Sequence, residues 1–530
     1  MKIIASIMVL VRFNPAHLEE ITGSKIEDIM EVPWKLGGES RMENGEFIAE
    51  FNPDRPDLYS IWGLARAIRL YLSKESYREI KVLNSSYVLD NKNPSDRPYI
   101  VSAVVKNSDA GKNLQYLIDF QEKLHATIGR NRRIAAIGIH DLHKVKFPLT
   151  YTEVPRDYKF IPLGETQEMN LKEFMQSNEK AKEYGNLVGE NIPAILDANG
   201  NIISLPPILN SNITALKEGV KDFFIDVTGI DLSTTQKVLN LLVGSLSYPN
   251  GEVFGVSVSG IKYPIFTRDS WKIDESEVRE ISGMELSHEE IQRSLIKMGY
   301  EVKDQVAYSP EYRIDIFGKV DFIEDVLKGY GYENIKESKE DFTTVGKGHG
   351  IRDMQYKLRE LMVGYGYVET SNFALINGSY NKIFGFSNEY IKILNPVTLE
   401  QDVIRPRISI SLIQSLLNNT RNPYPQRIFE VGTVIRNGTQ YESLGAASCH
   451  RQASFSEIKG LFIGLLEDLG LEYKIDKFEH ELFVEGRAAK ISIRGNQVGF
   501  LGEVHPRILK QIGLKMPLAI GEIDITGGIL

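Results

Sequence analysis

The alternation of apolar and polar residues predicts short strands and one amphipathic helix in the N-terminal part of the chain. The apolar run at residues 3–11 and the sequence EFIAEF at residues 46–51 predict buried β-strands. Between them, Asn14-Pro15 and Gly23 mark the start and the end of a short helix. A later helix keeps its apolar side chains on one face, at Ile61, Leu64, Ala65, Ile68 and Leu72. We therefore expect a small α/β domain over residues 1–85.

A polar linker is predicted at residues 86–97, and a β-rich domain follows at residues 98–270. The sequences YIVSAVV, FFIDV and EVFGVSVSG predict strands, and short helical stretches lie between them. Residues 271–340 form a smaller unit, of winged or helical-β type. In it, Ser287 and Glu290 form a capping box at the start of a helix, and a second helix begins near Val320.

The last part of the chain, residues 341–530, predicts a large antiparallel sheet with helices. A helix begins near Ile351, and the later strands are separated by turns with hairpin-like spacing. These strands are YIKIL, QRIFEVGTVI, AAKISIRG, QVGFLGEV and LAIGEIDI. Taken together, the pattern predicts an α+β multidomain protein.

Composition excludes several classes of protein. The 530 residues carry 62 Lys and Arg against 71 Asp and Glu, a formal charge of −9, which argues against a chain that coats nucleic acid unaided. One cysteine, Cys449, excludes internal disulfides, zinc ribbons and iron–sulfur sites, and it favours a reducing cytosol. No apolar segment reaches 18 residues, so we expect no membrane span.

A group of carboxylates is the sharpest candidate for chemistry. Asp321, Glu324 and Asp325 share one face if a helix begins at residue 320 or 321, and Asp315 lies just upstream. Carboxylate oxygens are hard ligands that suit Mg²⁺. From the residues alone, the simpler alternative is that acidic groups in the first helical turn complement the helix dipole.

Two further groups of residues could line a site. The basic run Arg130–Arg133 is either a solvated face or a phosphate contact, and His140-Asp141 follows it. Neighbours on a strand point to opposite faces, so His140 and Asp141 would not meet, and His140 is more simply structural. The rigid turn at residues 206–211, which contains Asn210, could form one wall of a pocket with Asp226 and Thr228, unless these residues only pack a sheet surface.

Mononucleotide and dinucleotide motifs such as GxxxxGK[ST] and GxGxxG are missing from the chain. A different set of short motifs follows in order along nearly the whole chain. They are Asn52–Leu58 with Gly63–Arg66, Gly138–Asp141, Pro206–Asn210 with Asp226–Gly229, Tyr312–Tyr332, and Leu394–Pro396 with Arg405 and Phe429–Gly432. Read together, these stretches resemble the β-subunit family of phenylalanyl-tRNA synthetase, in its archaeal/eukaryotic form.

The resemblance implies a cytoplasmic heterotetramer of two α and two β chains. In this family, the α subunit uses ATP to activate phenylalanine and then charges tRNA(Phe). The C-terminal domain of the β chain has the class II synthetase fold but is degenerate. No arginine follows Arg507, so the last strand offers no cation for ATP, and we expect no adenylation residue in this chain.

The same resemblance implies a metal site and an editing site. Asp315, Asp321, Glu324 and Asp325 match the family's carboxylates for Mg²⁺, which is shared with the α subunit. The domain at residues 98–270 would hydrolyse mischarged Tyr-tRNA(Phe), and its candidate pocket residues are Asn210, Asp226 and Thr228. His140 and Asp141 would then belong nearer the scaffold. Two alternatives stay open: a stand-alone tRNA-editing hydrolase and a non-enzymatic scaffold subunit.

Overall fold

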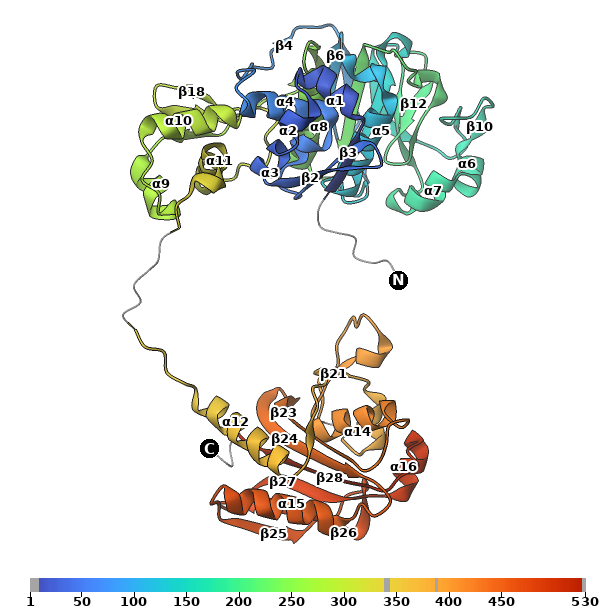
Figure 1. The fold of residues 1–530 in the computed structure, drawn as a ribbon. Helices are drawn as coiled ribbons and strands as arrows, with labels where there is room; N and C mark the ends of the chain where they lie inside the picture. The colour runs from blue at the N-terminus through green and yellow to red at the C-terminus, as the bar shows by residue number, and fades with distance from the viewer. Residues whose placement is uncertain (1–8, 338–343, 387–388, 527–530) are drawn as a thin grey trace. The chain divides into compact units, whose positions relative to one another are not determined.

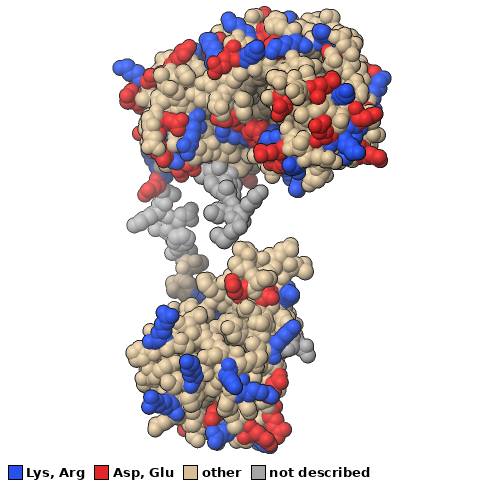
Figure 2. Space-filling model, turned by 90° about the vertical axis from the view of Figure 1, so that its right-hand side faces the viewer, with Lys and Arg blue, Asp and Glu red and all other residues tan. Residues whose placement is uncertain are grey.

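The computed structural model describes residues 9–337, 344–386 and 389–526, which belong to two compact units, Met1–Lys339 and Glu340–Leu530 (Figure 1). Both units mix helices with β-sheets. Acidic and basic side chains are interspersed over the face of the first unit seen in Figure 2. Within the described ranges, no helix has the length and apolar character needed to cross a membrane.

The first described elements form a three-stranded antiparallel sheet of order β1-β3-β2. Its strands are β1 (Val9–Phe13), β3 (Glu46–Phe51) and β2 (Gly38–Glu43). Helix α1 (Pro15–Thr22) has the predicted bounds, because the Asn14 side chain caps its first turn and Gly23 ends it with φ 63°. Residues 3–8 of the predicted strand lie outside the described residues. β1 continues beyond Val11 to Phe13, whose buried side chain faces Phe47 across the sheet.

An eleven-stranded mixed sheet forms the body of the first unit, in the order β13-β12-β11-β8-β5-β15-β6-β14-β7, with β16 and β4 attached to β15. Helices α8 (Leu232–Leu246) and α5 (Leu114–Ala126) pack against it, and α4 (Ile61–Tyr71) contacts α8. The strands are β13 (Leu209–Asn210), β12 (Ile202–Leu205), β11 (Ile192–Leu196), β8 (Leu149–Val154), β5 (Val88–Asn91), β15 (Glu252–Val258), β6 (Tyr99–Lys106), β14 (Phe223–Gly229), β7 (Ala135–Asp141), β16 (Ile261–Tyr263) and β4 (Val82–Leu83).

The segment predicted as a linker, residues 86–97, is part of this sheet. Its strand β5 pairs in parallel with both β15 and β8. The interpretation as a linker is therefore wrong for Val88–Asn91. The segment has only one buried apolar residue in the strand, Leu89, so its sequence carries no alternating pattern from which the pairing could be predicted.

The end of the first unit combines a small sheet, of order β17-β19-β18, with three helices. These elements are β17 (Ser270–Lys272), α9 (Glu275–Ser282), α10 (His288–Lys297), β18 (Glu301–Lys303), β19 (Val306–Tyr308) and α11 (Lys319–Tyr330). The capping box predicted at the start of α10 is present, with bonds in both directions between Ser287 and Glu290. Helix α11 begins one residue before the predicted start and ends at Gly331.

The second unit is a seven-stranded sheet of order β20-β23-β24-β28-β27-β26-β25, and every pair except β20–β23 is antiparallel. Helices α12 (Gly350–Gly364) and α15 (Phe455–Asp468) share one core, and α14 (Ile408–Asn418) and α16 (Pro506–Ile512) share the other. The strands are β20 (Val368–Glu369), β23 (Gln426–Arg436), β24 (Thr439–Cys449), β25 (Tyr473–Lys477), β26 (Phe483–Ile493), β27 (Asn496–Val504) and β28 (Leu518–Asp524).

One predicted strand of this unit, YIKIL at residues 390–394, is absent. The segment makes only an isolated bridge between Lys392 and Val403. Its apolar residues are largely exposed, including Leu394 at 96%. A strand forms where one face of the segment is buried against other residues. This segment has no such face, so its alternating pattern does not lead to a strand.

Candidate functional site

A cavity of about 360 Å³ opens in the first unit where β7, β14 and α5 meet the loop between β12 and β13. Most of its wall is apolar, from residues such as Leu114, Ile118, Ile137, Ile139 and Leu205. Several polar groups also line it, and they are Gln121, Glu122, Arg132, Lys180, Ser204, Asn210, Thr214 and Asp226. An apolar cavity with a few placed polar groups is the usual form of a small-ligand site.

Asp226 is one of two carboxylates that line this cavity, and a histidine fixes its orientation. His140 Nε2 lies 2.9 Å from Asp226 Oδ2, and His140 Nδ1 lies 2.7 Å from the Thr214 hydroxyl. An ionised carboxylate only accepts hydrogen bonds, so with Asp226 ionised His140 Nε2 is the donor of this bond. Within the described residues, Asp226 Oδ1 receives no hydrogen bond, and it remains as an acceptor for a ligand of the cavity.

Gly138 makes room for this pair. It lies directly opposite Asp226 in the pairing of β7 with β14. A Cβ atom at this position would lie 2.1 Å from Asp226 Oδ2 and 2.9 Å from His140 Nε2. Any side chain at Gly138 would therefore displace the carboxylate.

The structure brings two of the three predicted pocket residues together. Asn210 lines the cavity, and its Oδ1 accepts a hydrogen bond from Ser204 at 2.9 Å. Thr228 is not among the residues that line it, and Arg97 donates to both its hydroxyl and its carbonyl at 3.0 Å. Burial lowers the pKa of Arg97 to about 10. Asp141 lies away from His140, as strand alternation predicts, and its carboxylate caps the turn at His143.

Arg132 lines the cavity, although the sequence predicted only that it belongs to a basic run. It donates to the carbonyls of Pro207 and Ile208 at 3.2 and 2.9 Å, and to Glu122 at 2.7 Å. A hydrogen bond from His125 is the main reason why the pKa of Glu122 falls to about 2, and the charge of Arg132 adds to the effect. Burial lowers the pKa of His125 below its usual value.

The predicted metal carboxylates divide into two pairs. Asp315 and Asp325 both bind Arg313, whose Nη2 lies 2.7 Å from an oxygen of each. Burial outweighs Arg313 and raises the pKa of Asp315. At Asp325, burial is again the largest effect and acts to raise the pKa, but the charges of Arg313, Arg55 and Lys328 together outweigh it and the pKa is lowered. The Tyr300 hydroxyl donates to Asp325 at 2.6 Å.

The other two carboxylates have separate partners. Asp321 accepts from the backbone N–H groups of Phe317 and Gly318 at 2.7 and 2.9 Å, as the helix-dipole alternative predicts. Glu324 pairs with Lys328 at 2.9 Å and is 52% exposed. Among the described residues, no three acidic, histidine or cysteine side chains are grouped so that they could hold a metal ion. The four residues alone therefore do not fit Mg²⁺.

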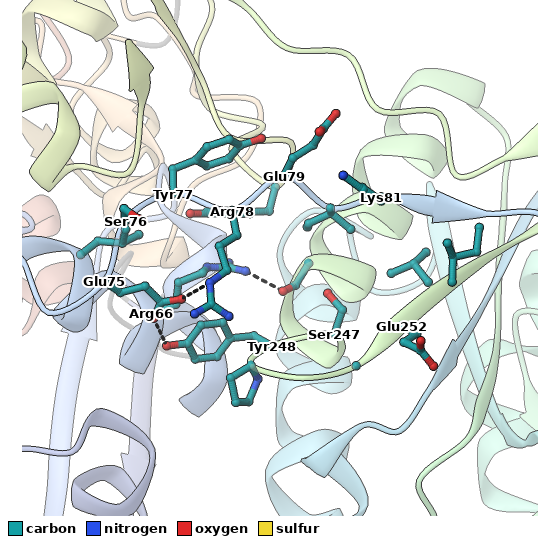
Figure 3. A pocket seen from close by; sticks show the side chains of 18 residues that line it. Arg66, Glu75, Ser76, Tyr77, Arg78, Glu79, Lys81, Ser247, Tyr248 and Glu252 are labelled. Carbon is teal, nitrogen blue, oxygen red and sulfur yellow. Dashed lines mark hydrogen bonds and ion pairs between the residues drawn. The ribbon is translucent and has the colours of Figure 1, made fainter. Parts of the chain in front are cut away.

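A second cavity of the first unit, of about 340 Å³, lies between the end of α4, residues 75–83 and the turn after α8 (Figure 3). Two of its charged groups have neutral partners within the unit. Glu75 accepts from the Tyr248 hydroxyl at 2.7 Å, and Arg66 donates to the Gly244 carbonyl at 2.6 Å. Arg66 also stacks on the Tyr312 ring at 3.3 Å. No predicted site residue lines this cavity, and we assign no reaction to it.

In the second unit, internal ion pairs occupy the end of the sheet near β28. Arg436 donates to Asp524 at 2.5 Å, and Arg405 donates to Glu430 at 2.6 Å. Glu522 is 1% exposed and accepts from the backbone and the hydroxyl of Ser409 at 2.9 and 2.8 Å. Burial raises the pKa of Glu522. The last strand, β28, thus carries the carboxylates Glu522 and Asp524. The arginine that pairs with Asp524, Arg436, belongs to β23.

Comparisons with known proteins agree over both units. Residues 335–525 match the family model described as phenylalanyl tRNA synthetase beta chain CLM domain, and residues 271–332 match the tRNA synthetase B5 domain. The phenylalanine–tRNA ligase beta subunit of Saccharolobus islandicus strain M.14.25 is 36% identical over 541 residues, covering 98% of both chains. That of Methanosarcina barkeri is 35% identical over 533 residues, covering 96% of this chain and 97% of the relative.

A solved structure is similar to the first unit. It is an N-terminal fragment of the phenylalanyl-tRNA synthetase beta subunit from Pyrococcus horikoshii, with 34% identity and a TM-score of 0.56. The match covers 61% of this chain and 100% of that fragment.

Proposed function

The chain belongs to the family of phenylalanine–tRNA ligase β subunits, and from this premise we propose that its first unit removes tyrosine from mischarged tRNA(Phe). As a β subunit, it is part of an α/β ligase that attaches phenylalanine to tRNA. We assign it to a cytoplasmic assembly of two α and two β chains, which uses ATP and Mg²⁺. The four domains of the β chain would be residues 1–85, 98–270, 271–340 and 341–530.

Adenylation belongs to the α subunit in this proposal. A site for ATP needs cations where phosphate charge develops. In the second unit, Glu522 and Asp524 of β28 are carboxylates, and Arg436 is already paired with Asp524. This arrangement repels phosphate, and it supports a class II-like domain without adenylation chemistry.

The position of Asp226 carries the editing proposal. Tyrosine differs from phenylalanine by one hydroxyl, and a hydrophobic pocket rejects an added hydroxyl by only about 100-fold. The cavity offers apolar walls for the ring and Asp226 Oδ1 as an acceptor for the phenol O–H. Phenylalanine would leave this buried acceptor without a partner, which costs about 1–3 kcal/mol. The cavity thus favours tyrosine, as a site that corrects the α subunit must.

The reaction in the cavity is hydrolysis of the ester that joins tyrosine to the terminal ribose. Water adds to the ester carbonyl, the acyl C–O bond breaks, and the ribose oxygen takes a proton. His140 and Thr214 hold Asp226 in place, while Asn210, tied to Ser204, faces the same space. These residues bind and orient the tyrosyl group.

Asp226→Asn in the α/β complex tests the proposal. Hydrolysis of preformed Tyr-tRNA(Phe) should fall about 10- to 100-fold, because a charge-assisted hydrogen bond worth roughly 1.5–3 kcal/mol is lost. Attachment of phenylalanine should not change. Asp141→Asn is the matched control, because Asp141 is also buried but does not line the cavity. If the wild-type complex leaves Tyr-tRNA intact, the chain is a scaffold, and if the β chain alone hydrolyses it, the chain is a stand-alone hydrolase.

The magnesium site remains a proposal for the assembled complex. Asp315, Asp321, Glu324 and Asp325 have internal partners in this chain, so further ligands would have to come from the α subunit. Asp321 and Glu324 are the members of the set that do not bind Arg313. Bound there, Mg²⁺ would supply a divalent charge that joins the two chains.

A further inference from the structure

The basic turn Arg130–Arg133 has an unusual backbone. Arg130, Asn131 and Arg132 have φ values of 47°, 54° and 65°, a left-handed conformation that residues other than glycine rarely adopt. Backbone hydrogen bonds hold the turn, from Arg132 N to His125 O at 3.3 Å and from Ile134 N to Gly129 O at 3.0 Å. Three consecutive strained residues persist only where the surroundings enforce them, and such strain gathers at functional sites.

The turn directs its arginines to two different places. Arg132 is 7% exposed, lines the cavity, and ties the turn to the carbonyls of Pro207 and Ile208 in the cavity wall. Its Nε is buried without a hydrogen-bond partner in the described structure. Arg130 and Arg133 are exposed, and of the arginines in this turn only Arg132 has a carboxylate partner among the described residues. Two exposed arginines thus flank, in the sequence, the residue that lines the cavity and binds its wall.

We propose that Arg130 and Arg133 bind phosphate groups of the 3′-terminal strand of tRNA while its aminoacylated end occupies the cavity. This inference rests on the proposed editing function. The guanidinium fork matches phosphate oxygens, and the ligand of an editing cavity arrives attached to a phosphodiester chain. In a subunit with a net charge of −9, phosphates need local cations. Backbone hydrogen bonds fix the turn, and with it the backbone of both arginines, next to Arg132 before tRNA arrives.

The test compares two substrates in the α/β complex. The first is Tyr-tRNA(Phe), and the second is tyrosyl-adenosine, which has the same ester but no phosphate. Arg130→Ala with Arg133→Ala should lower kcat/KM for Tyr-tRNA about tenfold and leave tyrosyl-adenosine hydrolysis unchanged. The slope of log kcat/KM against log salt should become shallower by about 1.4, since each phosphate contact on a single strand contributes about 0.7.

Controls separate this inference from the editing proposal. Arg279→Ala with Arg293→Ala removes two exposed arginines from α9 and α10, and it should leave both activities as they are. Arg130→Lys with Arg133→Lys keeps both charges and should retain most of the salt slope. If Arg130→Ala with Arg133→Ala has the wild-type kcat/KM for Tyr-tRNA, the inference is wrong although editing stands. The same holds if kcat/KM falls equally for both substrates. If wild type hydrolyses neither substrate, the editing proposal fails and this inference fails with it.

Discussion

Asp325→Ala separates a role in the buried ion network from a role as a metal ligand. Asp325 is 1% exposed and lies 2.7 Å from Arg313 Nη2 and 2.6 Å from the Tyr300 hydroxyl. Removal of one partner from a buried ion pair costs about 3–5 kcal/mol, because the other charge stays buried. Asp315 still binds Arg313 through both of its oxygens, so we expect the lower end, about 3 kcal/mol.

Thermal unfolding of the α/β complex, in EDTA and in Mg²⁺, measures this loss. For a unit larger than 150 residues, each kcal/mol shifts Tm by about 2–4 °C, so the transition of the first unit should fall by about 6–12 °C in both buffers. Asp321→Ala is the control. It removes an acceptor from two backbone N–H groups, as the loss of a helix cap does, and should cost about 1 kcal/mol.

A metal role predicts a different pattern. If Asp325 acts mainly as a ligand, Asp325→Ala should destabilise the complex in Mg²⁺ and leave its Tm in EDTA within a degree of wild type. That result would refute the network argument. The triple variant Arg313→Met, Asp315→Leu and Asp325→Leu removes all three charges of this buried group, and it should recover most of the lost stability if the cost comes from an unpaired Arg313.

Three further outcomes follow from the geometry. Gly138→Ala should lower Tyr-tRNA hydrolysis about 100-fold with phenylalanine attachment intact, because its Cβ meets Asp226 Oδ2 at 2.1 Å. In unfolding scans against pH, stability should fall below the unfolded His125 pKa of 6.5, since burial keeps the folded residue neutral while the unfolded chain takes up a proton. The pKa of Glu122 is lowered to about 2, so a second loss of stability should begin near pH 4.3, the unfolded value for Glu, and continue towards pH 2. His125→Gln should remove the loss of stability that begins at pH 6.5. Ser287→Ala should cost about 1 kcal/mol by thermal unfolding, because it removes the capping box of α10.

Elements whose signals are local could be predicted closely from the sequence. The bounds of α1 and the start of α10 depend on caps within three residues, and both were predicted correctly. The linker at residues 86–97 was not, because β5 is defined by pairing with β15 and β8, which lie far away in the chain. Backbone pairing uses groups that every residue has, so a short polar strand leaves no mark in the sequence.

The cavity was only partly predictable for the same reason. Asp226 and Asn210 could be proposed from a strand and a turn, and both line it. The partner of Asp226, His140, is 86 residues away, and its position depends on the register of β14 against β7. Thr228 shares the alternation of Asp226, but Arg97, 131 residues away, occupies its hydrogen-bonding groups. Alternation along a strand predicts which face of the sheet a side chain lies on. It does not predict which residues pack against that face.

The carboxylates of α11 show how spacing alone leaves a role undecided. Residues at i, i+3 and i+4 lie on one side of a helix, yet neighbours differ by about 100° around its axis. Glu324 and Asp325 differ in just this way, because Glu324 is 52% exposed while Asp325 is buried with Phe322 and Ile323. The inner carboxylate meets Arg313, and the outer one meets Lys328 and solvent. A metal shared with another chain would therefore have to be reached from Glu324 and Asp321, while Asp325 anchors the helix from within.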